Sequence, residues 1–483
     1  MKKVVSATFA FAILIIFWQL FFLHQASGIP KDYSIQNTVG GGGHHLEGFR
    51  SFVGGFKKTG HYPITANGQQ MEVFETYRMG DRGKMYLLWF DSLFSESNWS
   101  YIRTSSIYFI SSLLIYFLAF YRFPNKIFSI ASTTLIGSSS FQLYEVYVNN
   151  NIFSWPISTT VLIMGLNSFA FRDSLRQVCL RNLVVALFTG LLLGCIEQIR
   201  TEPIVIGVSV VIIYMLMKSI PMKSRLLLVS LCSIGFVVSN VATNYYLDSE
   251  QKKAAIYISD NGGEVYQGFQ RKTHLLWHPI FCGFGDYASD LGYKWDDYAA
   301  FAYALNILRV NEPNLWPEFN ESLKEKKLSD YFLASDSTYK SKLEDRNDYE
   351  PILKDKILKD LTEHPLVFIR LYLYRLMNVF IHTSGFQVHA FNFLIININL
   401  NGLGFVFFIA LALALKKRDW FSVKVLFFSL PLLATSLIIT SQNSYEFYSI
   451  YPQLSAAILL SYVASYIASL RNGKKNFLPQ LKW

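Results

Sequence analysis

Three groups of charged and aromatic residues have types and spacings that suit chemistry. The first is His44-His45-Leu46-Glu47, which follows four glycines and opens a stretch whose apolar residues recur at helical spacing. The carboxylate of Glu47 is suited to take the proton of an acceptor hydroxyl, and the neighbouring His45 is a candidate to bind the same substrate. The alternative is that these residues form the polar face of a helix lying on a surface.

The second group is the short charged turn from Glu197 to Pro203, between two apolar runs. A guanidinium matches phosphate oxygens with two parallel hydrogen bonds, so Arg200 is a candidate for a lipid-linked phosphate. Glu202 is a candidate substrate contact beside it. The alternatives are that Arg200 pairs with Glu197 or Glu202, or that these charges anchor the ends of the two helices.

The third group lies between residues 274 and 297, where glycines that permit tight turns separate the chemically active residues. Aromatic rings beside carboxylates suit a sugar, and the candidate substrate-binding residues are His274, Trp277, His278, Asp286, Asp296 and Asp297. An aromatic loop folded onto a membrane interface would have the same composition. Two histidines spaced four apart suggest a metal site, but Pro279 argues against a long helix there, so we predict no metal ligands.

Apolar runs of about 20 residues, the length that crosses a bilayer as a helix, recur along the chain and must position these groups. They lie at about 4–24, 104–121, 127–147, 152–171, 183–199, 203–219, 225–246, 391–415, 420–440 and 446–470. The first is longer than the core of a signal peptide and has no convincing cleavage site after it, so we expect a retained anchor. The pattern predicts an all-α polytopic membrane protein with about ten transmembrane helices.

Basic clusters at the ends of these runs predict the sidedness, because short cytoplasmic loops carry an excess of Lys and Arg. Ten spans place every cluster inside, from Lys2-Lys3 to the C-terminal tail, and place the hydrophilic stretches 25–103 and 247–365 together outside. The segment 366–380 contains Arg370 and Arg375, whose burial in the hydrocarbon would be costly. We expect it to be an interfacial helix on the outer face, although an eleventh span is possible.

Three parts follow from this layout. Residues 1–246 form an N-terminal transmembrane module that includes the outer loop 25–103. Residues 247–390 form an extracytoplasmic region with the interfacial helix near 366–380. Residues 391–483 supply the C-terminal transmembrane helices and a short cytoplasmic tail. A location in the plasma membrane, which is the inner membrane of a two-membrane cell, with an extracytoplasmic active face is expected.

The composition agrees with a membrane protein and excludes several other classes. Of the 483 residues, 52% are hydrophobic and 16% are charged, well below the quarter that is usual in soluble domains. The net charge of +10 reflects the basic clusters at helix ends, so we expect no nucleic-acid partner. Four cysteines without metal-ligand spacing support neither a disulfide framework nor a zinc site.

The layout resembles the GT-C superfamily of membrane glycosyltransferases, which includes the dolichyl-phosphate-mannose mannosyltransferase-like families, and its bacterial branch in particular. The similar features are an N-terminal span, a first outer loop that reaches Gly60-His61-Tyr62-Pro63, and Arg200-Thr201-Glu202 after an apolar run. The segment from Trp277-His278 through Gly283-Phe284-Gly285 to Gly292–Asp297 is similar to an outer-loop pattern of bacterial relatives.

The resemblance implies transfer of a sugar from a polyprenyl-phosphate donor to a glycan or glycolipid acceptor outside the cytoplasm, with membrane lipids around the site. It implies a basic residue near the donor phosphate, at Arg200, with Arg82 as a second candidate. The family usually has an aspartate in the first loop where this chain has His45, so Glu47 is the candidate base and Asp81 the reserve. No cofactor is implied with certainty, and a divalent metal ion is possible because family members differ.

Other function classes stay open at this point. An O-antigen polymerase or ligase would also have many spans and a large outer loop, but would work through outer-loop arginines. A transporter or flippase would need polar residues deep within its spans, and the run Asn397, Asn399 and Asn401 lies near one end of a predicted span. A non-catalytic assembly partner is the remaining alternative.

Overall fold

The computed structural model describes the chain in segments: residues 59–60, 64–67, 70–73, 98–121, 126–139, 151–170, 178–199, 204–217, 220–261, 276–294, 297–312, 348–381, 386–390, 393–398, 403–416, 423, 426–427 and 450–471. These segments are mostly helical, as predicted. The first span, the expected helix near residues 44–58 and most of the run 420–440 lie outside them.

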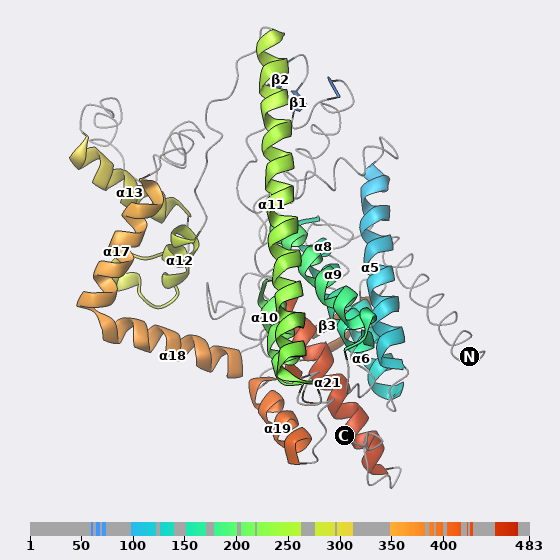
Figure 1. Cartoon of the computed structure of the whole chain (residues 1–483). Coiled ribbons are helices and arrows are strands. Elements are labelled where there is room, and N and C mark those ends of the chain that lie inside the picture. Colours follow the sequence, from blue (N-terminus) through green and yellow to red (C-terminus); the bar gives the residue numbers. More distant parts are fainter. Residues whose placement is uncertain are drawn as a thin grey trace.

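Six helices in the first half follow the predicted spans (Figure 1). They are α5 (Asn98–Tyr121), α6 (Lys126–Ser138), α8 (Asn151–Ala170), α9 (Leu180–Glu197), α10 (Ile204–Met215) and α11 (Met222–Asp260). At 1.5 Å per residue, the 12 residues of α10 extend about 18 Å, which is shorter than the hydrocarbon core of a bilayer.

Two of the described helices are long and apolar enough to cross a membrane, namely α9 and α11. Only 28% of the most apolar stretch of α11 is buried inside the protein, and Val237, Val238 and Val241 are each more than half exposed. A core helix of a soluble protein would bury such residues. The outward apolar face of α11 therefore indicates a membrane protein.

Close packing between α9 and α11 depends on glycine. A Cβ atom at Gly190 would lie 1.9 Å from the carbonyl oxygen of Cys232, and one at Gly235 would lie 2.4 Å from that of Leu187. Gly190 and Gly194 form a Gly-x-x-x-Gly pair, the spacing that lets two membrane helices approach with their backbones in contact. The same close approach joins α8 to α5, where a Cβ at Gly165 would meet the backbone of Tyr116 at 2.9 Å.

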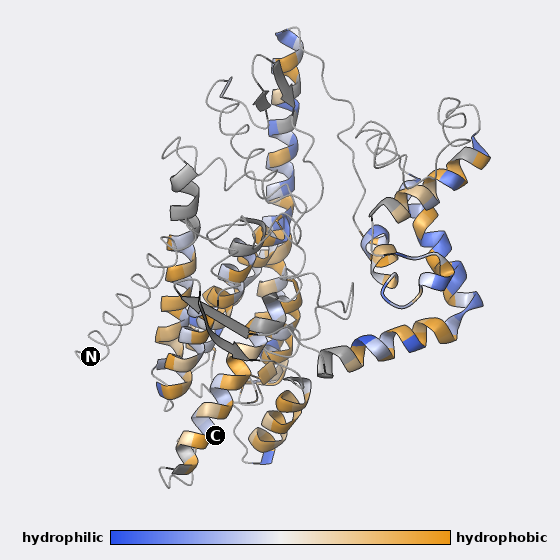
Figure 2. Ribbon diagram, turned by 180° about the vertical axis from the view of Figure 1, so that it is seen from behind, coloured by the Kyte–Doolittle hydropathy of each residue, from blue (hydrophilic) through white to orange (hydrophobic). Residues whose placement is uncertain are grey.

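α11 continues well beyond the predicted span 225–246. Its 39 residues extend about 58 Å, nearly twice the thickness of the hydrocarbon core. The half toward Asp260 is the more hydrophilic one (Figure 2). There α11 contacts a small antiparallel hairpin from the first hydrophilic stretch, formed by β1 (Ile64–Asn67) and β2 (Gln70–Val73) (Figure 1). The contact places β2 of the first hydrophilic stretch beside the part of α11 that belongs to the second.

The second hydrophilic stretch folds around a core of its own. Its elements are α12 (Trp277–Phe284), the 3₁₀ turn η2 (Ser289–Leu291), α13 (Asp297–Asn311), α17 (Tyr349–Glu363) and α18 (Pro365–Ile381). Aromatic side chains dominate this core, including Phe281, Phe284, Tyr293, Phe301 and Tyr349. The chain breaks between two helices at His364-Pro365.

The ambiguous segment 366–380 forms one continuous helix, α18. It runs across the direction of α11, the orientation of a helix that lies along a surface (Figure 1). In both views the C-terminal end of α18 lies beside the half of α11 that is nearer Met222. The predicted place was beside the other ends of the helices, on the outer face. A transverse helix with one apolar face can occupy either surface of a membrane.

The C-terminal part differs from the prediction at one predicted span. A second hairpin, β3 (Phe386–Ala390) and β4 (Phe393–Ile398), occupies the start of the run 391–415, so the helix there is the shorter α19 (Leu403–Lys416). Ile395, Ile396 and Ile398 are β-branched residues that favour strands. The last predicted span, 446–470, coincides with the helix α21 (Ile450–Arg471). The two hairpins are the exception to the all-α prediction.

Candidate functional site

The C-terminal end of α9 carries a polar group directly ahead of the predicted phosphate-binding turn. The Glu197 carboxylate accepts hydrogen bonds from the Asn240 side-chain amide of α11 and, at 3.2 Å, from that of Gln198. The Asn240 carbonyl oxygen in turn accepts a bond of 2.9 Å from Asn244, one helical turn further along α11. Among the described residues, the donors to Glu197 are thus neutral amides. Arg200 and Glu202 lie outside the described residues.

Trp277 and His278, predicted to contact substrate, open helix α12. The backbone N–H groups of both point to the Glu350 carboxylate, at 2.8 and 3.4 Å. A carboxylate at this place satisfies donors that the first turn of a helix leaves without a partner. Glu350 therefore ties the start of α12 to α17.

The His278 side chain lies inside the core of the second stretch. It is 1% exposed, its Nδ1 is 2.5 Å from the Tyr349 hydroxyl, and its ring lies against Phe301. The ring therefore has no access to solvent in this structure, and sugar binding by His278 stays a prediction. Trp277 stays partly exposed, and the Lys354 ammonium lies 5.9 Å from the centre of its ring.

Asp286 is the second predicted contact that the structure places inside. Its side chain and that of Arg375 are both fully buried, 3.8 Å apart. Arg375 also donates a bond of 2.6 Å to the Gly283 carbonyl, and its guanidinium lies over the rings of Phe284 and Tyr372. Burial lowers the pKa of Arg375, and Asp286 opposes that shift. The Asp286 side chain therefore lies in the interior with the guanidinium, and its contact with substrate stays a prediction.

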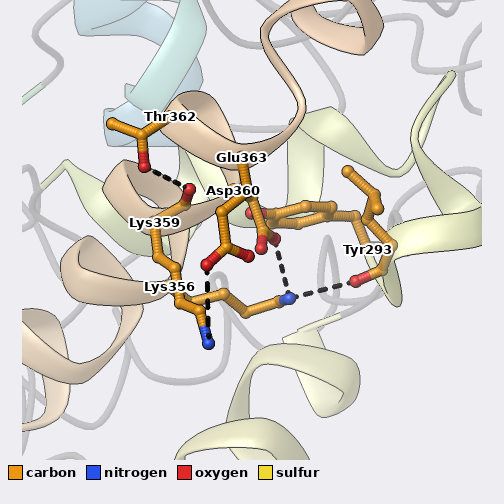
Figure 3. A network of polar contacts seen from close by, with 7 residues as sticks. Tyr293, Lys356, Lys359, Asp360, Thr362 and Glu363 are labelled. Carbon is orange, nitrogen blue, oxygen red and sulfur yellow. Dashed lines mark hydrogen bonds and ion pairs between the residues drawn. The ribbon is translucent and has the colours of Figure 1, made fainter.

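A further polar cluster holds the loop after α12 against α17 (Figure 3). The Lys356 ammonium donates to the Leu291 carbonyl at 3.0 Å and pairs with Asp360 at 2.8 Å. Asp360 also accepts a bond of 2.8 Å from the Tyr293 hydroxyl. Burial, together with the neighbouring Asp360, raises the pKa of Tyr293, so this phenol stays protonated and can donate. The ammonium also lies about 5 Å from the ring centres of Tyr293 and Tyr303.

The side chains of the remaining predicted site residues lie outside the part of the chain that the structure describes. Asp297 begins α13, but its side chain is not described. Those that lie outside the described residues are Glu47, Asp81, Arg82, His45, Arg200, Glu202, His274 and Asp296. In both views, α12 stands apart from α9 and α11, so the described part does not bring Trp277 to the end of α9 (Figures 1 and 2).

Several contributors were missed by the sequence reasoning. Glu350, Tyr349 and the pair Lys356–Asp360 lie on α17, where no candidate site residue was predicted. Asn240 and Asn244 could have been recognised from the sequence. They lie four residues apart in the predicted span 225–246, and amide side chains within a membrane helix need hydrogen-bond partners. In the described part of the chain, no group of three or more His, Cys, Asp or Glu side chains is placed to hold a metal ion.

A buried polar group also lies inside the helix bundle. The Asn167 side chain donates to Thr189 at 3.0 Å and accepts a bond of 2.7 Å from the Tyr214 hydroxyl. These neutral side chains satisfy one another and join α8, α9 and α10, so the group acts as an interhelical contact.

Comparisons with known proteins give limited information. No family model matches the chain, and no curated protein matches it. Two solved structures from Archaeoglobus fulgidus are similar at a TM-score of 0.37 each, with this chain covered to 96%. One is the archaeal oligosaccharyltransferase AglB in complex with an inhibitory peptide and a dolichol-phosphate, at 14% identity. The other is an oligosaccharyltransferase tethered to an acceptor peptide, at 12% identity.

This chain spans about half the length of those two proteins, 52% in each case. Identities and TM-scores this low establish neither a shared family nor a shared activity. The described residues form a mostly helical protein with two helices long and apolar enough to cross a membrane, and with a separately packed hydrophilic stretch.

Proposed function

We propose that the protein is an integral membrane glycosyltransferase that moves a sugar from a polyprenyl-phosphate donor to an extracytoplasmic glycan or glycolipid. The observation that best supports the proposal is the polar group at the end of α9, three residues before Arg200. A carboxylate held by Asn240 at the edge of an apolar bundle is suited to orient a nearby guanidinium. Arg200 would then present its remaining N–H groups to the donor phosphate.

In the proposed reaction, an acceptor hydroxyl attacks the anomeric carbon of the donor sugar. The bond between that carbon and the phosphate oxygen breaks, and the polyprenyl phosphate leaves. Glu47 takes the proton of the attacking hydroxyl, with Asp81 as the reserve base. Arg200, or Arg82 in its place, offsets the charge that develops on the leaving phosphate.

The rest of the predicted site contributes to substrate binding in this proposal. His45 and Glu202 accompany the base and the phosphate-binding arginine. Trp277, partly exposed at the start of α12, is suited to stack on a sugar ring. His274, Asp296 and Asp297 are the remaining candidates. A divalent metal is not required by the proposed steps.

A polymerase or ligase that works through outer-loop arginines is less well supported. Arg375, an arginine of the predicted extracytoplasmic region 247–390, is fully buried with Asp286 and Gly283. It is therefore occupied in packing α18 against α12.

A transporter is also less well supported. Asn397, proposed above as one polar residue near a span, lies in β4 opposite Gln387 of β3. Asn399 and Asn401 lie outside the described residues. The buried group around Asn167 is neutral and internally hydrogen-bonded, whereas transport sites in membranes usually contain ionisable residues.

The donor site is tested by binding of a short polyprenyl phosphate to the purified full-length protein. Arg200→Ala is expected to weaken binding about 10- to 100-fold, because hydrogen bonds to charged groups contribute about 1.5–3 kcal/mol. The control is Lys252→Ala, which removes an exposed positive charge from the projecting part of α11. Equal affinity of the Arg200→Ala variant and the parent would remove Arg200 from the donor site.

A further inference from the structure

Helix α18 has two opposite faces with different surroundings. Phe368, Leu371 and Arg375 are at most 3% exposed and pack into the core of the second hydrophilic stretch. On the other side, Leu366 is 77% and Leu373 is 55% exposed. At 100° per residue, these two positions point away from the buried face. The exposed apolar face of α18 consists of Leu366, Ile369, Leu373, Leu376 and Met377.

The two arginines of α18, which made a membrane location costly in the sequence, lie off this exposed face. Arg375 points inward to the Gly283 carbonyl and Asp286. Arg370 lies at the margin, where it donates a bond of 3.1 Å to the Tyr374 hydroxyl and lies over the same ring. Tyr374 stacks on Tyr287 with their ring centres 5.2 Å apart. An apolar face bordered by Tyr and Arg is typical of a surface in the headgroup region of a membrane.

We propose that α18 lies in the plane of the membrane interface, with its exposed apolar face in the lipid. Continuity with the membrane bundle favours lipid over a protein partner. α18 packs against α19, which itself exposes Phe405, Phe408 and Ile409 by 49–60%. The exposed apolar surface thus continues from α18 onto an apolar helix of the C-terminal part, as a surface covered by a bilayer would. The transverse course of α18 fits the same location (Figure 1).

This location would fix the distance between the second hydrophilic stretch and the membrane surface. Arg375 connects α18 to the Gly283 carbonyl of α12, and Phe368 packs against Phe284 at 4.9 Å between ring centres. α12 and the loop after it would therefore be held at a constant distance from the lipid. The inference does not depend on glycosyl transfer.

The test uses spin labels on the full-length protein in nanodiscs of phosphatidylethanolamine and phosphatidylglycerol. One cysteine at a time is introduced, as Ile369→Cys or Leu373→Cys, in a background with Cys179→Ser and Cys195→Ser. These two changes remove the half-buried and the exposed natural cysteine, and the two that remain, Cys232 and Cys282, are buried. Val241→Cys on the outward face of α11 is the lipid control, and Lys359→Cys, exposed on α17, is the water control.

Collision rates of each label with oxygen and with a water-soluble nickel complex give the result. If α18 lies in lipid, the oxygen-to-nickel ratio at both positions is several-fold above that of Lys359→Cys and close to that of Val241→Cys. A ratio like that of Lys359→Cys means a face in water and overturns the proposal. Low collision rates with both reagents mean a face covered by protein, such as a second copy, and overturn it as well.

Discussion

Arg375 shows how the role of a charged residue depends on the helix face it occupies. From the sequence, this arginine was an argument against placing the segment in a membrane. In the structure it is fully buried on the inward face of α18, in contact with Gly283 and Asp286. Its spacing of four and seven residues from Leu371 and Phe368 placed it on the packed face. The partners could not be predicted, because about 90 residues separate them in the sequence.

Loss of Arg375 should destabilise the second hydrophilic stretch. Removing one partner of a buried ion pair leaves the other charge buried, which costs about 3–5 kcal/mol. We expect Arg375→Met to lower the stability of this part by that amount. The measurement is protease susceptibility of the second stretch at increasing urea concentration in the full-length protein.

The matched control for this prediction is Arg370→Met, on the same helix but exposed. An exposed pair contributes little to stability, so this change should have an effect below about 1 kcal/mol. Arg375→Lys should recover only part of the loss, because an ammonium lacks the planar fork of a guanidinium. Equal effects of the two Met variants would contradict the structural role of Arg375.

At the scale of elements, apolar runs in the sequence predicted most of the helices. The close contacts between helices depend on single residues such as Gly190, which an apolar run does not reveal. α5, α8, α9 and α21 begin and end within a few residues of the predicted spans, apart from the N-terminal extension of α5. The strand β4 was assigned to a span, because a short run of isoleucines has no periodicity that separates strand from helix. The extension of α11 to Asp260 was missed because its polar end carries no apolar signal.

Replacement of a glycine between α9 and α11 should disturb the bundle. A Cβ at Gly190 would lie 1.9 Å from a backbone oxygen, which cannot move independently of its helix. Overpacking of this kind costs about 1–3 kcal/mol. We therefore expect Gly190→Ala to reduce the stability of the protein in detergent, as measured by SDS-induced unfolding.

Gly207→Ala on α10 is the control, because a Cβ there would meet the end of the Leu193 side chain at 3.0 Å, and that end can rotate away. Alanine also stabilises a helix interior by about 0.5–1 kcal/mol relative to glycine. The close approach of α9 and α11 would be refuted by Gly190→Ala and Gly207→Ala variants of equal stability.

At the scale of the whole molecule, the number of spans determines which side each hydrophilic stretch occupies. Ten spans place residue 385, which follows α18, outside the cytoplasm, and an eleventh span through 366–380 would place it inside. We expect reporter fusions at Gly385 to show a non-cytoplasmic location, because α18 exposes one apolar face instead of an apolar circumference. A cytoplasmic reporter would mean that this segment crosses.

The composition and basic clusters predicted a helical membrane protein, and the described residues agree with it. The convergence of Glu47, Arg200 and the residues near Trp277 on one cavity stays a prediction. Two of its members, His278 and Asp286, are instead buried in a separate core. Sequence spacing identified a polar, aromatic stretch, but it could not separate side chains that face solvent from those that support the fold.

The most direct test of the central claim is mass spectrometry of envelope glycolipids and glycans from cells with the protein, without it, and with Glu47→Gln. If the protein is a polyprenyl-phosphate glycosyltransferase, one glycan should lack a sugar when the protein is absent, and the lipid-phosphate donor should accumulate. Glu47→Gln, expressed at the parent level, should give the same loss. Identical glycans and glycolipids in cells with and without the protein would contradict the proposed function, and full transfer by Glu47→Gln would contradict the assignment of the base.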